Sequence, residues 1–228
     1  MSQHAYETTE DIVGRAIKIV AKQSMKDALA EEIKLSKEAG AGTYETEQYG
    51  KLPSLTVSTD AGWQRRASSR RYNSASGIVH FIGVRSGKVV DTNLTINRCQ
   101  ICDKIEKFKE KKRKAKVHKK DTKIQKYNSK LKNIKAHLCL KNFWGTWKAM
   151  ELHSIVHLVR NFPEKRQAYI RPLVIDDDAP TPSHLKEDTG PMSKGCLPKS
   201  LSGIKCLVDP SHCKQVVGGA YYKLGGKK

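Results

Sequence analysis

The order of hydrophobic and polar residues predicts a helix near the start of the chain. Apolar residues recur with a period near 3.6 between residues 9 and 38. Thr8 or Thr9 can cap its first turn, and two glycines follow its last turn. The pattern therefore predicts an amphipathic helix over residues 9–38, followed by a polar loop over residues 41–53.

The next part of the chain has the composition of β-strands. Residues 55–59 alternate between apolar and polar side chains, and residues 77–84 are rich in β-branched and aromatic residues. A short glycine-containing turn joins the second segment to a third one, residues 88–96. We expect three strands, of which the last two form a hairpin.

A second helix and a fourth strand are predicted after residue 140. Apolar residues at helical spacing predict a helix over residues 149–162, and Pro163 is expected to end it. Residues 169–175 have the apolar run of a buried strand, in which Pro172 indicates a bulge or an early position. One more short strand is expected after residue 204.

The order of these elements predicts a mixed α/β fold. Three successive strands, a helical crossover and a fourth strand allow the fourth strand to lie parallel to the first. The ends of those two strands carry Asp60 and Asp176. We expect an N-terminal helix and linker over residues 1–50 and an α/β core over residues 51–228, interrupted by a basic insertion at residues 103–136.

The charge of the chain is concentrated in that insertion. The 228 residues carry a formal net charge of +20, and residues 104–135 hold 14 Lys and one Arg against three acids, which is +12. Because like charges repel one another, we expect a solvated, mobile insertion. Its densest run, Lys111, Lys112, Arg113 and Lys114, is typical of a nuclear-import or nucleic-acid-binding patch, and a mobile loop can also contact phosphates.

Several classes of protein do not fit the sequence. No apolar run approaches the roughly 18 residues of a membrane span, so we expect no membrane partner. The first residues show no basic segment followed by an apolar one, so we expect no secretory signal. The six Cys are therefore expected to be thiols or metal ligands.

The acids at the strand ends are candidates for binding a divalent cation. Asp60 follows the first strand, and Asp176, Asp177 and Asp178 follow the fourth. Mg²⁺ prefers oxygen ligands, and two such ions about 4 Å apart support phosphodiester chemistry. The alternative is that Asp60 starts a turn and that the three successive acids form a solvated loop.

Cysteine and histidine residues flank the basic insertion on both sides. Cys99 and Cys102 form a CxxC pair, and His137 and Cys139 follow after a spacer of 34 residues. CxxC is the chelating half of many zinc sites. We expect Zn²⁺ to clamp the two ends of the insertion, with four unrelated side chains as the alternative.

Aromatic and basic residues follow the first acid. Trp63, Arg65 and Arg66 suit contact with a nucleic-acid backbone and an unstacked base. The alternative is an exposed basic loop with the Trp63 ring in the core. Trp144 and Trp147 are expected to be core residues.

Together these segments resemble the Mutator-like transposase domain of eukaryotic DNA transposons. The resemblance covers residues 10 to 224 and rests on short motifs in a fixed order. They are TVSTDAGWQRR at 56–66, YNSASG at 72–77, GKVVD at 87–91, the CxxC and His/Cys pairs, NFWGTWKAME at 142–151, VIDDD at 174–178 and LVDPSHCK at 207–214.

The resemblance implies a fold, a reaction and a partner. It implies an RNase H-like core that cleaves DNA and transfers strands with Mg²⁺ or Mn²⁺ at a DDE-type set of acids. Asp60 then corresponds to the first acid, Asp176 to the second, and Asp178 is its alternate. The implied partner is the DNA of transposon ends, the location is the nucleus, and a homo-oligomer is compatible with the resemblance.

Departures from the family pattern affect the expected activity. The family has a glycine at each of the positions taken by Ile175 and Asp177, and its third acid is a Glu well beyond the DPSH segment. We therefore expect a truncated or degenerate copy with reduced or no activity. The alternative function is a non-enzymatic, zinc-stabilised protein that binds nucleic acid, and a ribosomal-type protein would explain the charge alone.

Overall fold

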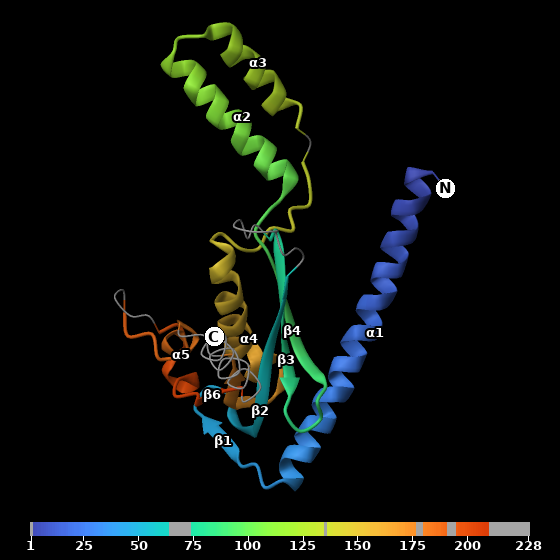
Figure 1. Cartoon of the computed structure of the whole chain (residues 1–228), viewed down its shortest axis with the longest axis vertical. Coiled ribbons are helices and arrows are strands. Elements are labelled where there is room, and N and C mark those ends of the chain that lie inside the picture. Colours follow the sequence, from blue (N-terminus) through green and yellow to red (C-terminus); the bar gives the residue numbers. More distant parts are fainter. Residues whose placement is uncertain (1, 64–73, 135, 177–179, 191–194, 210–228) are drawn as a thin grey trace, which may run out of the picture. The chain divides into compact units, whose positions relative to one another are not determined.

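The computed structural model describes residues 2–63, 74–134, 136–176, 180–190 and 195–209 (Figure 1). In this part of the chain, a long helix is followed by four strands, three helices and two more strands that are separated by a short helix and a 3-10 turn. They are α1 Gln3–Glu38, β1 Thr43–Thr46, β2 Gly50–Trp63, β3 Ser76–Gly83, β4 Val89–Ile96, α2 Gln100–Val117, α3 Asp121–Lys132, α4 Trp147–Arg166, β5 Tyr169–Ile175, α5 Pro180–His184, the 3-10 turn η1 Lys199–Leu201 and β6 Cys206–Val208.

The strands form one mixed sheet with the order β4-β3-β2-β5-β6, and β1 pairs with β2. β2 and β3 run antiparallel, because Thr56 bonds to Val84 while Gly62 lies beside Ile78. The turn after Gly83 reverses the chain into β4, as the predicted hairpin requires. β5 runs parallel to β2, and β6 runs parallel to β5. The predicted parallel pairing of the first and fourth strands is confirmed.

The pairing of β2 with β5 contains the predicted irregularity. Leu55 pairs with Ile170 and Val57 pairs with Leu173, so the register shifts between the two pairs. Between these pairs β5 has two residues, Arg171 and Pro172, opposite one residue of β2, and the peptide bond between the two is cis. Proline has no N–H to donate to a ladder, and a bulge is where a strand can tolerate it.

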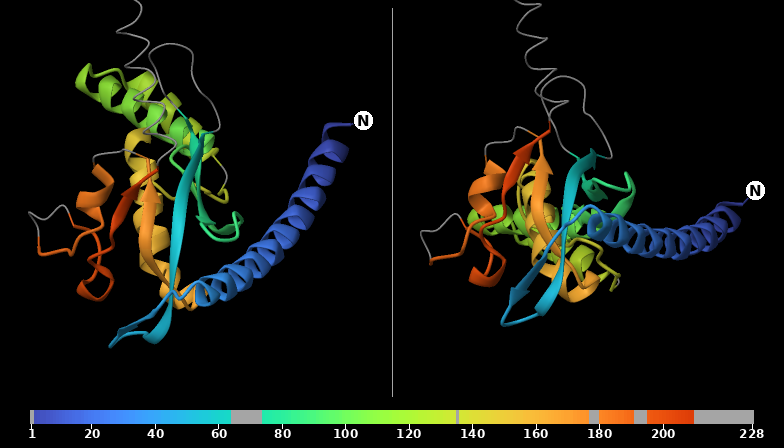
Figure 2. Two further views of the ribbon diagram at one scale, coloured as in Figure 1. Left: turned by 60° about the horizontal axis from the view of Figure 1, so that its bottom comes forward. Right: turned by 90° about the horizontal axis from the view of Figure 1, so that it is seen from below.

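The hydrophobic core lies between the sheet and α4. Side chains of β3 alternate between buried and half-buried along the whole strand, so one face of the sheet carries the core. The ribbon of α4 lies against one face of the sheet (Figure 2). The Phe81 and Phe162 rings lie 6.2 Å apart between β3 and α4. Fully buried members of this cluster include Leu55, Val57, Phe81, Phe162, Ala168, Leu173 and Leu197.

The second half of α1 belongs to the same core. Ala28 and Leu29 are buried in it, and the Glu32 side chain is fully buried. The Glu32 carboxylate accepts hydrogen bonds of 3.2 and 2.7 Å from the backbone N–H groups of Arg85 and Ser86. A side chain on Gly83 would collide with that carboxylate, so the turn between β3 and β4 fits the helix closely.

Four predicted boundaries were wrong. The first strand, predicted over residues 55–59, is β2 and runs from Gly50 to Trp63, so Asp60 lies inside it. α1 begins at Gln3, with Ser2 as its N-cap, so the cap is not Thr8 or Thr9. The expected loop at 41–53 contains β1, which pairs with the start of β2 and places its Tyr44 ring edge-on, 5.1 Å from the Tyr169 ring. A tertiary contact thus orders a segment whose local sequence is polar.

Pro163 does not end α4, which continues to Arg166. The missing proline N–H costs one helical hydrogen bond, but the carbonyl of Pro163 still accepts a 3.0 Å bond from the Gln167 N–H. The Arg166 guanidinium also donates a 2.6 Å bond to the buried carboxylate of Asp91, which anchors the last turn.

The chain divides into two compact units. One contains residues 1–62, 78–93 and 151–228, and the other contains residues 63–77 and 94–150. The first unit holds the sheet core and α1, and the second holds the α2–α3 insertion. The predicted division at residue 50 stays a prediction.

Candidate metal centre and nucleic-acid surface

The basic insertion, predicted as a solvated, mobile segment, forms a helical hairpin whose side chains are mostly exposed. α2 and α3 pack against each other, with Ala115 buried between them. The rings of Phe108 and Tyr127 stack with centroids 6.4 Å apart, and Lys130 lies over the Phe108 ring. Lysine is a good helix former, and apolar residues spaced three or four apart within the run supply a packing stripe.

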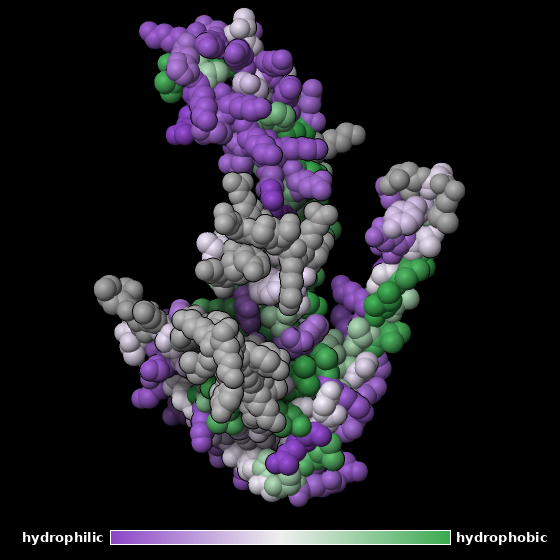
Figure 3. Space-filling view, in the orientation of Figure 1, coloured by the Kyte–Doolittle hydropathy of each residue, from purple (hydrophilic) through white to green (hydrophobic). Residues whose placement is uncertain are grey.

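The positively charged side chains of the hairpin lie mostly on its surface. Lys111, Arg113 and Lys114 are exposed, and Lys112 is half-buried. Hydrophilic side chains cover the hairpin in the space-filling view (Figure 3). Glu110 is the local counter-charge: it accepts bonds of 3.0 and 3.1 Å from Arg113, and this contact lowers the Glu110 pKa.

A pocket of about 200 Å³ lies where the two helices meet at their connection. Its lining carries several positive side chains and one aromatic ring. The residues are Lys111, Lys114, His118, Lys120, Lys123 and Tyr127. Such a lining suits an anion of the size of a phosphate group.

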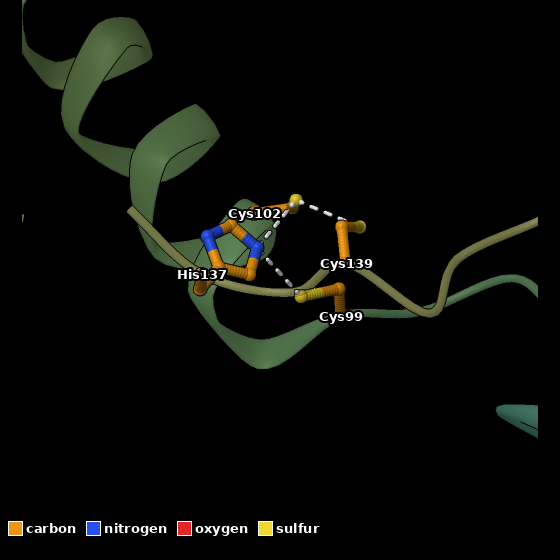
Figure 4. A group of neighbouring side chains, drawn as sticks. All are labelled: Cys99, Cys102, His137 and Cys139. Atoms are coloured by element: carbon orange, nitrogen blue, oxygen red, sulfur yellow. Dashed lines mark hydrogen bonds between the residues drawn. The ribbon is translucent and has the colours of Figure 1, made fainter. Parts of the chain in front are cut away.

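The predicted Cys/His set converges at the base of the hairpin (Figure 4). Cys99 and Cys102 come from the start of α2, whereas His137 and Cys139 come from the segment that follows α3. The His137 Nε2 atom lies 3.3 Å from the Cys99 Sγ and 3.5 Å from the Cys102 Sγ, which is itself 3.5 Å from the Cys139 Sγ.

The geometry of this set fits a tetrahedral zinc ion. All four donor atoms lie within 4.8 Å of one another. Zinc bonds of 2.0 to 2.3 Å place tetrahedral ligands about 3.5 Å to 3.8 Å apart. Three thiols and one imidazole are donors that zinc prefers in structural sites. The four residues therefore could hold a metal such as zinc.

Neighbouring groups shift the thiol pKa values in opposite directions. The backbone N–H of Cys102 is the main cause that lowers the pKa of Cys99, to about 7. The Cys102 pKa is raised to about 11, mainly because its thiol bonds to the Cys139 side chain. A cation bound between the sulfur atoms would replace the thiol protons and stabilise the deprotonated thiols.

The Asn142 side chain links the segment that enters the hairpin to the segment that leaves it. Its side-chain oxygen accepts a 2.7 Å bond from the Ile96 N–H, and its amide donates a 2.8 Å bond to the Leu94 carbonyl. The backbone N–H groups of Asn142 and Phe143 both donate to the Ile96 carbonyl. The returning chain is thus tied to the end of β4 independently of any metal.

The sheet brings the predicted acids to neighbouring strands. Ser58 on β2 pairs with Val174 on β5, and continuing this register by two residues would set Asp60 beside Asp176. Neighbouring strands lie about 4.8 Å apart. Both acids are exposed; Asp176 directly follows β5, whereas Asp60 lies within β2, three residues before its end at Trp63.

A third acid, Asp209, lies at the same edge and was not considered as a metal ligand from the sequence. Ile175 pairs with Val208, and the Asp209 N–H donates a 2.9 Å bond to the Ile175 carbonyl, so the next step of the register sets Asp209 beside Asp176. The sequence does show an acid directly after the short apolar run Leu207–Val208. The pairing of β5 with β6 was needed to see that this acid lies near Asp176.

The side chains of these acids are not gathered as the Cys/His donors are. Among the residues that the structure describes, the Cys/His set is the one group of three or more candidate ligands whose donor atoms come together. Asp178, Arg65 and Arg66 lie outside the described residues. The binding of Mg²⁺ or Mn²⁺ at this edge stays a prediction.

The side chains of Trp63 and Trp144 are described, whereas that of Trp147 lies outside the described part of the structure. The half-buried Trp63 ring covers Gly77, where any side chain would collide with it. Trp144 is 75% exposed, so its prediction as a core residue was wrong. Lys141 lies 5.5 Å from the centre of the Trp144 ring, a short distance along the chain from the Cys/His set.

Comparison with known proteins decides the family. The model of the Mutator-like transposase family matches residues 1–228, which is the whole chain. The chain belongs to the Mutator-like transposase family. Neither the curated proteins nor the solved structures provide a match. None of the helices described for this Mutator-like chain combines the length and apolar character of a membrane span.

Proposed function

We propose that this chain is a transposase domain that binds transposon-end DNA through the zinc-clamped hairpin and cleaves it at the carboxylate edge of the sheet. Family membership supports the reaction class. The register that sets Asp60 beside Asp176 is the observation that carries the assignment of the acids. The proposed place of action is the nucleus.

DNA contact rests on the charge and shape of the hairpin. Its helices present lysines along their length, and the pocket at their connection can receive a backbone phosphate. Residues 104–135 carry +12 of the total +20, so most of the favourable field for a polyanion comes from this element. Exposed Trp144 adds a ring on which an unstacked base can stack.

Cleavage rests on the three strand ends. Asp60, Asp176 and Asp209 would hold the divalent ions that polarise the phosphodiester and activate the attacking oxygen. An RNase H-like core is compatible with the observed sheet, in which an antiparallel meander is followed by two parallel strands. Asp209 takes the place of the third acid that the sequence motifs seemed to lack.

DNA binding is tested by changing lysines that line the hairpin pocket. The triple variant Lys111→Ala/Lys114→Ala/Lys123→Ala should bind DNA more weakly, and its salt slope should fall by about 2 to 3, because each phosphate contact contributes about 0.9. Alanine at Lys34, Lys37 and Lys186, three exposed lysines outside the hairpin, is the matched control. An unchanged slope in the hairpin variant would exclude this surface.

Cleavage is tested on end-labelled DNA with Mg²⁺ or Mn²⁺. Asp60→Asn and Asp176→Asn should each lower the cleavage rate at least about 100-fold, since each removes a charged ligand of the catalytic ions, and both should still bind DNA. Asp188→Asn, an exposed acid away from the strand ends, should cleave normally. Cleavage that survives Asp60→Asn would remove that residue from the site.

A second function is favoured by one observation, namely that the Cys/His donors converge and the acids do not. The chain would then bind DNA through the zinc-stabilised hairpin without cutting it. Wild-type protein that binds DNA tightly yet gives no cleavage with either ion would favour this function over the first.

A further inference from the structure

Two leucines in the segment that leaves the hairpin, Leu138 and Leu140, point into solvent, and we call them the leucine pair. Leu138 is 87% exposed, more than any other large hydrophobic residue in the part of the chain that the structure describes, and Leu140 is 63% exposed. Trp144, which follows on the same segment, is 75% exposed. Apolar side chains gathered outside the core in this way mark an interaction site.

The Cys/His set fixes the direction in which the leucine pair points. Residues 136–144 form neither a helix nor a turn, and the side chains of an extended segment point alternately to opposite sides. His137 and Cys139 both direct their donor atoms into the set (Figure 4). Leu138 and Leu140 therefore lie on the side that faces away from the set, which agrees with their exposure.

The charge around the leucine pair selects an anionic partner. Residues 122–150 contain seven Lys and neither Asp nor Glu, and Lys141 directly follows the pair. The partner must therefore be anionic and must also offer apolar surface. Duplex DNA does both, with phosphates along its backbone and stacked bases between them. Membership of a transposase family favours DNA over an anionic membrane or an acidic protein.

The leucine pair lies where DNA bound on the hairpin would reach it. The His137 Nε2 atom is 3.3 Å from the Sγ atom of Cys99, the N-cap of α2, so the pair is at the base of the hairpin and in the same compact unit. The 18 residues of α2 span about 27 Å, and one turn of duplex DNA spans about 34 Å. A duplex that follows the lysines along the hairpin for one turn therefore also passes its base.

We propose that the leucine pair is a wedge that enters the minor groove of the bound DNA, separates stacked base pairs and kinks the duplex. Leucine is one of the apolar side chains with which minor-groove proteins open base steps. Alternate residues of an extended chain lie about 6.8 Å apart, which is twice the rise of about 3.4 Å between base pairs, so each leucine meets its own base step. The wedge rests on the proposed DNA binding and is independent of cleavage at the carboxylate edge.

Energy transfer between dyes on the two ends of a mixed-sequence duplex of about three helical turns measures the kink. The wild-type chain should raise the transfer efficiency, and Leu138→Ala/Leu140→Ala should abolish most of this rise, because alanine is too short to enter a base step. Ile19→Ala/Val20→Ala is the matched control, since these side chains are 69% and 68% exposed and lie on α1 in the other unit. The control should kink the duplex as the wild type does.

Anisotropy titrations give a second readout. A mismatched base pair at the centre of the duplex lowers the cost of unstacking, so the wild-type chain should bind the mismatched duplex at least about tenfold more tightly than the matched one. The alanine variant should lose this preference, whereas Leu138→Met/Leu140→Met keeps two apolar side chains and should retain it. Zinc content is measured in both variants, because Leu138 lies between two candidate ligands. A methionine variant that holds zinc but leaves DNA straight would overturn the wedge.

Other outcomes separate the wedge from the proposed function. A wild-type chain that binds the duplex and leaves it straight, or equal losses in the alanine variant and its α1 control, would overturn the wedge and leave DNA binding in place. A chain that binds no DNA would overturn both. Binding to anionic phospholipid vesicles through the leucine pair, with no kink in DNA, would assign the pair to a membrane and also overturn the wedge.

Discussion

The Cys/His set and the carboxylate edge are both candidate metal sites, but the structure assembles them to different degrees. Cys99, Cys102, His137 and Cys139 place all four donor atoms within 4.8 Å of one another. Asp60, Asp176 and Asp209 occupy neighbouring positions in the sheet, yet their side chains form no comparable group among the described residues.

The chemistry of the donors explains the difference. Thiol and imidazole side chains can hydrogen-bond to one another in the absence of a metal ion. Carboxylates are ionised at neutral pH and repel one another, so their gathering depends on a cation. A site whose donor atoms already lie together can be recognised from their distances, whereas an acidic site has to be inferred from the register of the strands.

The largest expected effect concerns the preformed site. Cys102→Ser removes the thiol that contacts both His137 and Cys139, and structural zinc sites contribute about 10 to 16 kcal/mol of apparent binding free energy. We expect the zinc content of the purified chain to fall from about one ion to near zero. Cys206→Ser, outside the set, should keep its zinc; equal loss in both variants would contradict the assignment.

The next effect separates the two units. Phe162→Ala leaves a cavity beside Phe81 in the sheet core and should lower the free energy of unfolding by about 3 to 5 kcal/mol. Because Phe162 belongs to the unit that lacks the Cys/His set, zinc content should be unchanged under folding conditions. Denaturant unfolding and metal analysis of one preparation check both parts, and a parallel loss of zinc would show that the units are coupled.

A smaller effect concerns the exposed ring near the metal centre. Trp144→Ala should weaken binding of single-stranded DNA by about 1 to 3 kcal/mol if a base stacks on the ring. Trp144→Phe keeps an aromatic face and should retain most of the affinity. Fluorescence anisotropy measures both variants, and an equal loss in each would argue against stacking.

The smallest expected effect is the pH dependence of zinc binding at the Cys/His set. Cys102, whose pKa is about 11, must lose a proton when zinc binds at any pH near neutrality. Apparent affinity should therefore fall about tenfold from pH 8 to pH 7 through this thiol alone, and more steeply below pH 7, where Cys99 also binds a proton. Competition with a chelating dye measures it, and a flat profile would show that these thiols are not ligands.

Periodicity located the elements of the sheet core well. The segments predicted at 77–84 and 169–175 are β3 and β5 within one residue, and the parallel pairing followed from the order of elements. Both segments are strongly apolar, so the burial of their side chains outweighs their local conformational preferences. The candidate zinc ligands were also predicted, because CxxC and its His/Cys partner are recognisable by spacing alone.

Elements that depend on distant contacts were missed. The rule that like charges repel predicted a mobile insertion, but the packing of Phe108 on Tyr127 and the pairing of Glu110 with Arg113 favour a helical hairpin. Trp144 has the composition of a core residue and lies exposed. In each case the local pattern was compatible with two outcomes, and tertiary packing selected one.

The sequence by itself determined the α/β order, the family resemblance and which residues can bind metal, since these depend on residue type and spacing. The order of elements also predicted that Asp60 and Asp176 lie on neighbouring strands, but the structure was needed to add Asp209 to them. Asp209 gained its place beside Asp176 through the pairing of β6 with β5, and no local pattern records that pairing. Neighbouring strands of the sheet come from segments far apart in the chain. Their order depends on how the whole core buries its apolar surface.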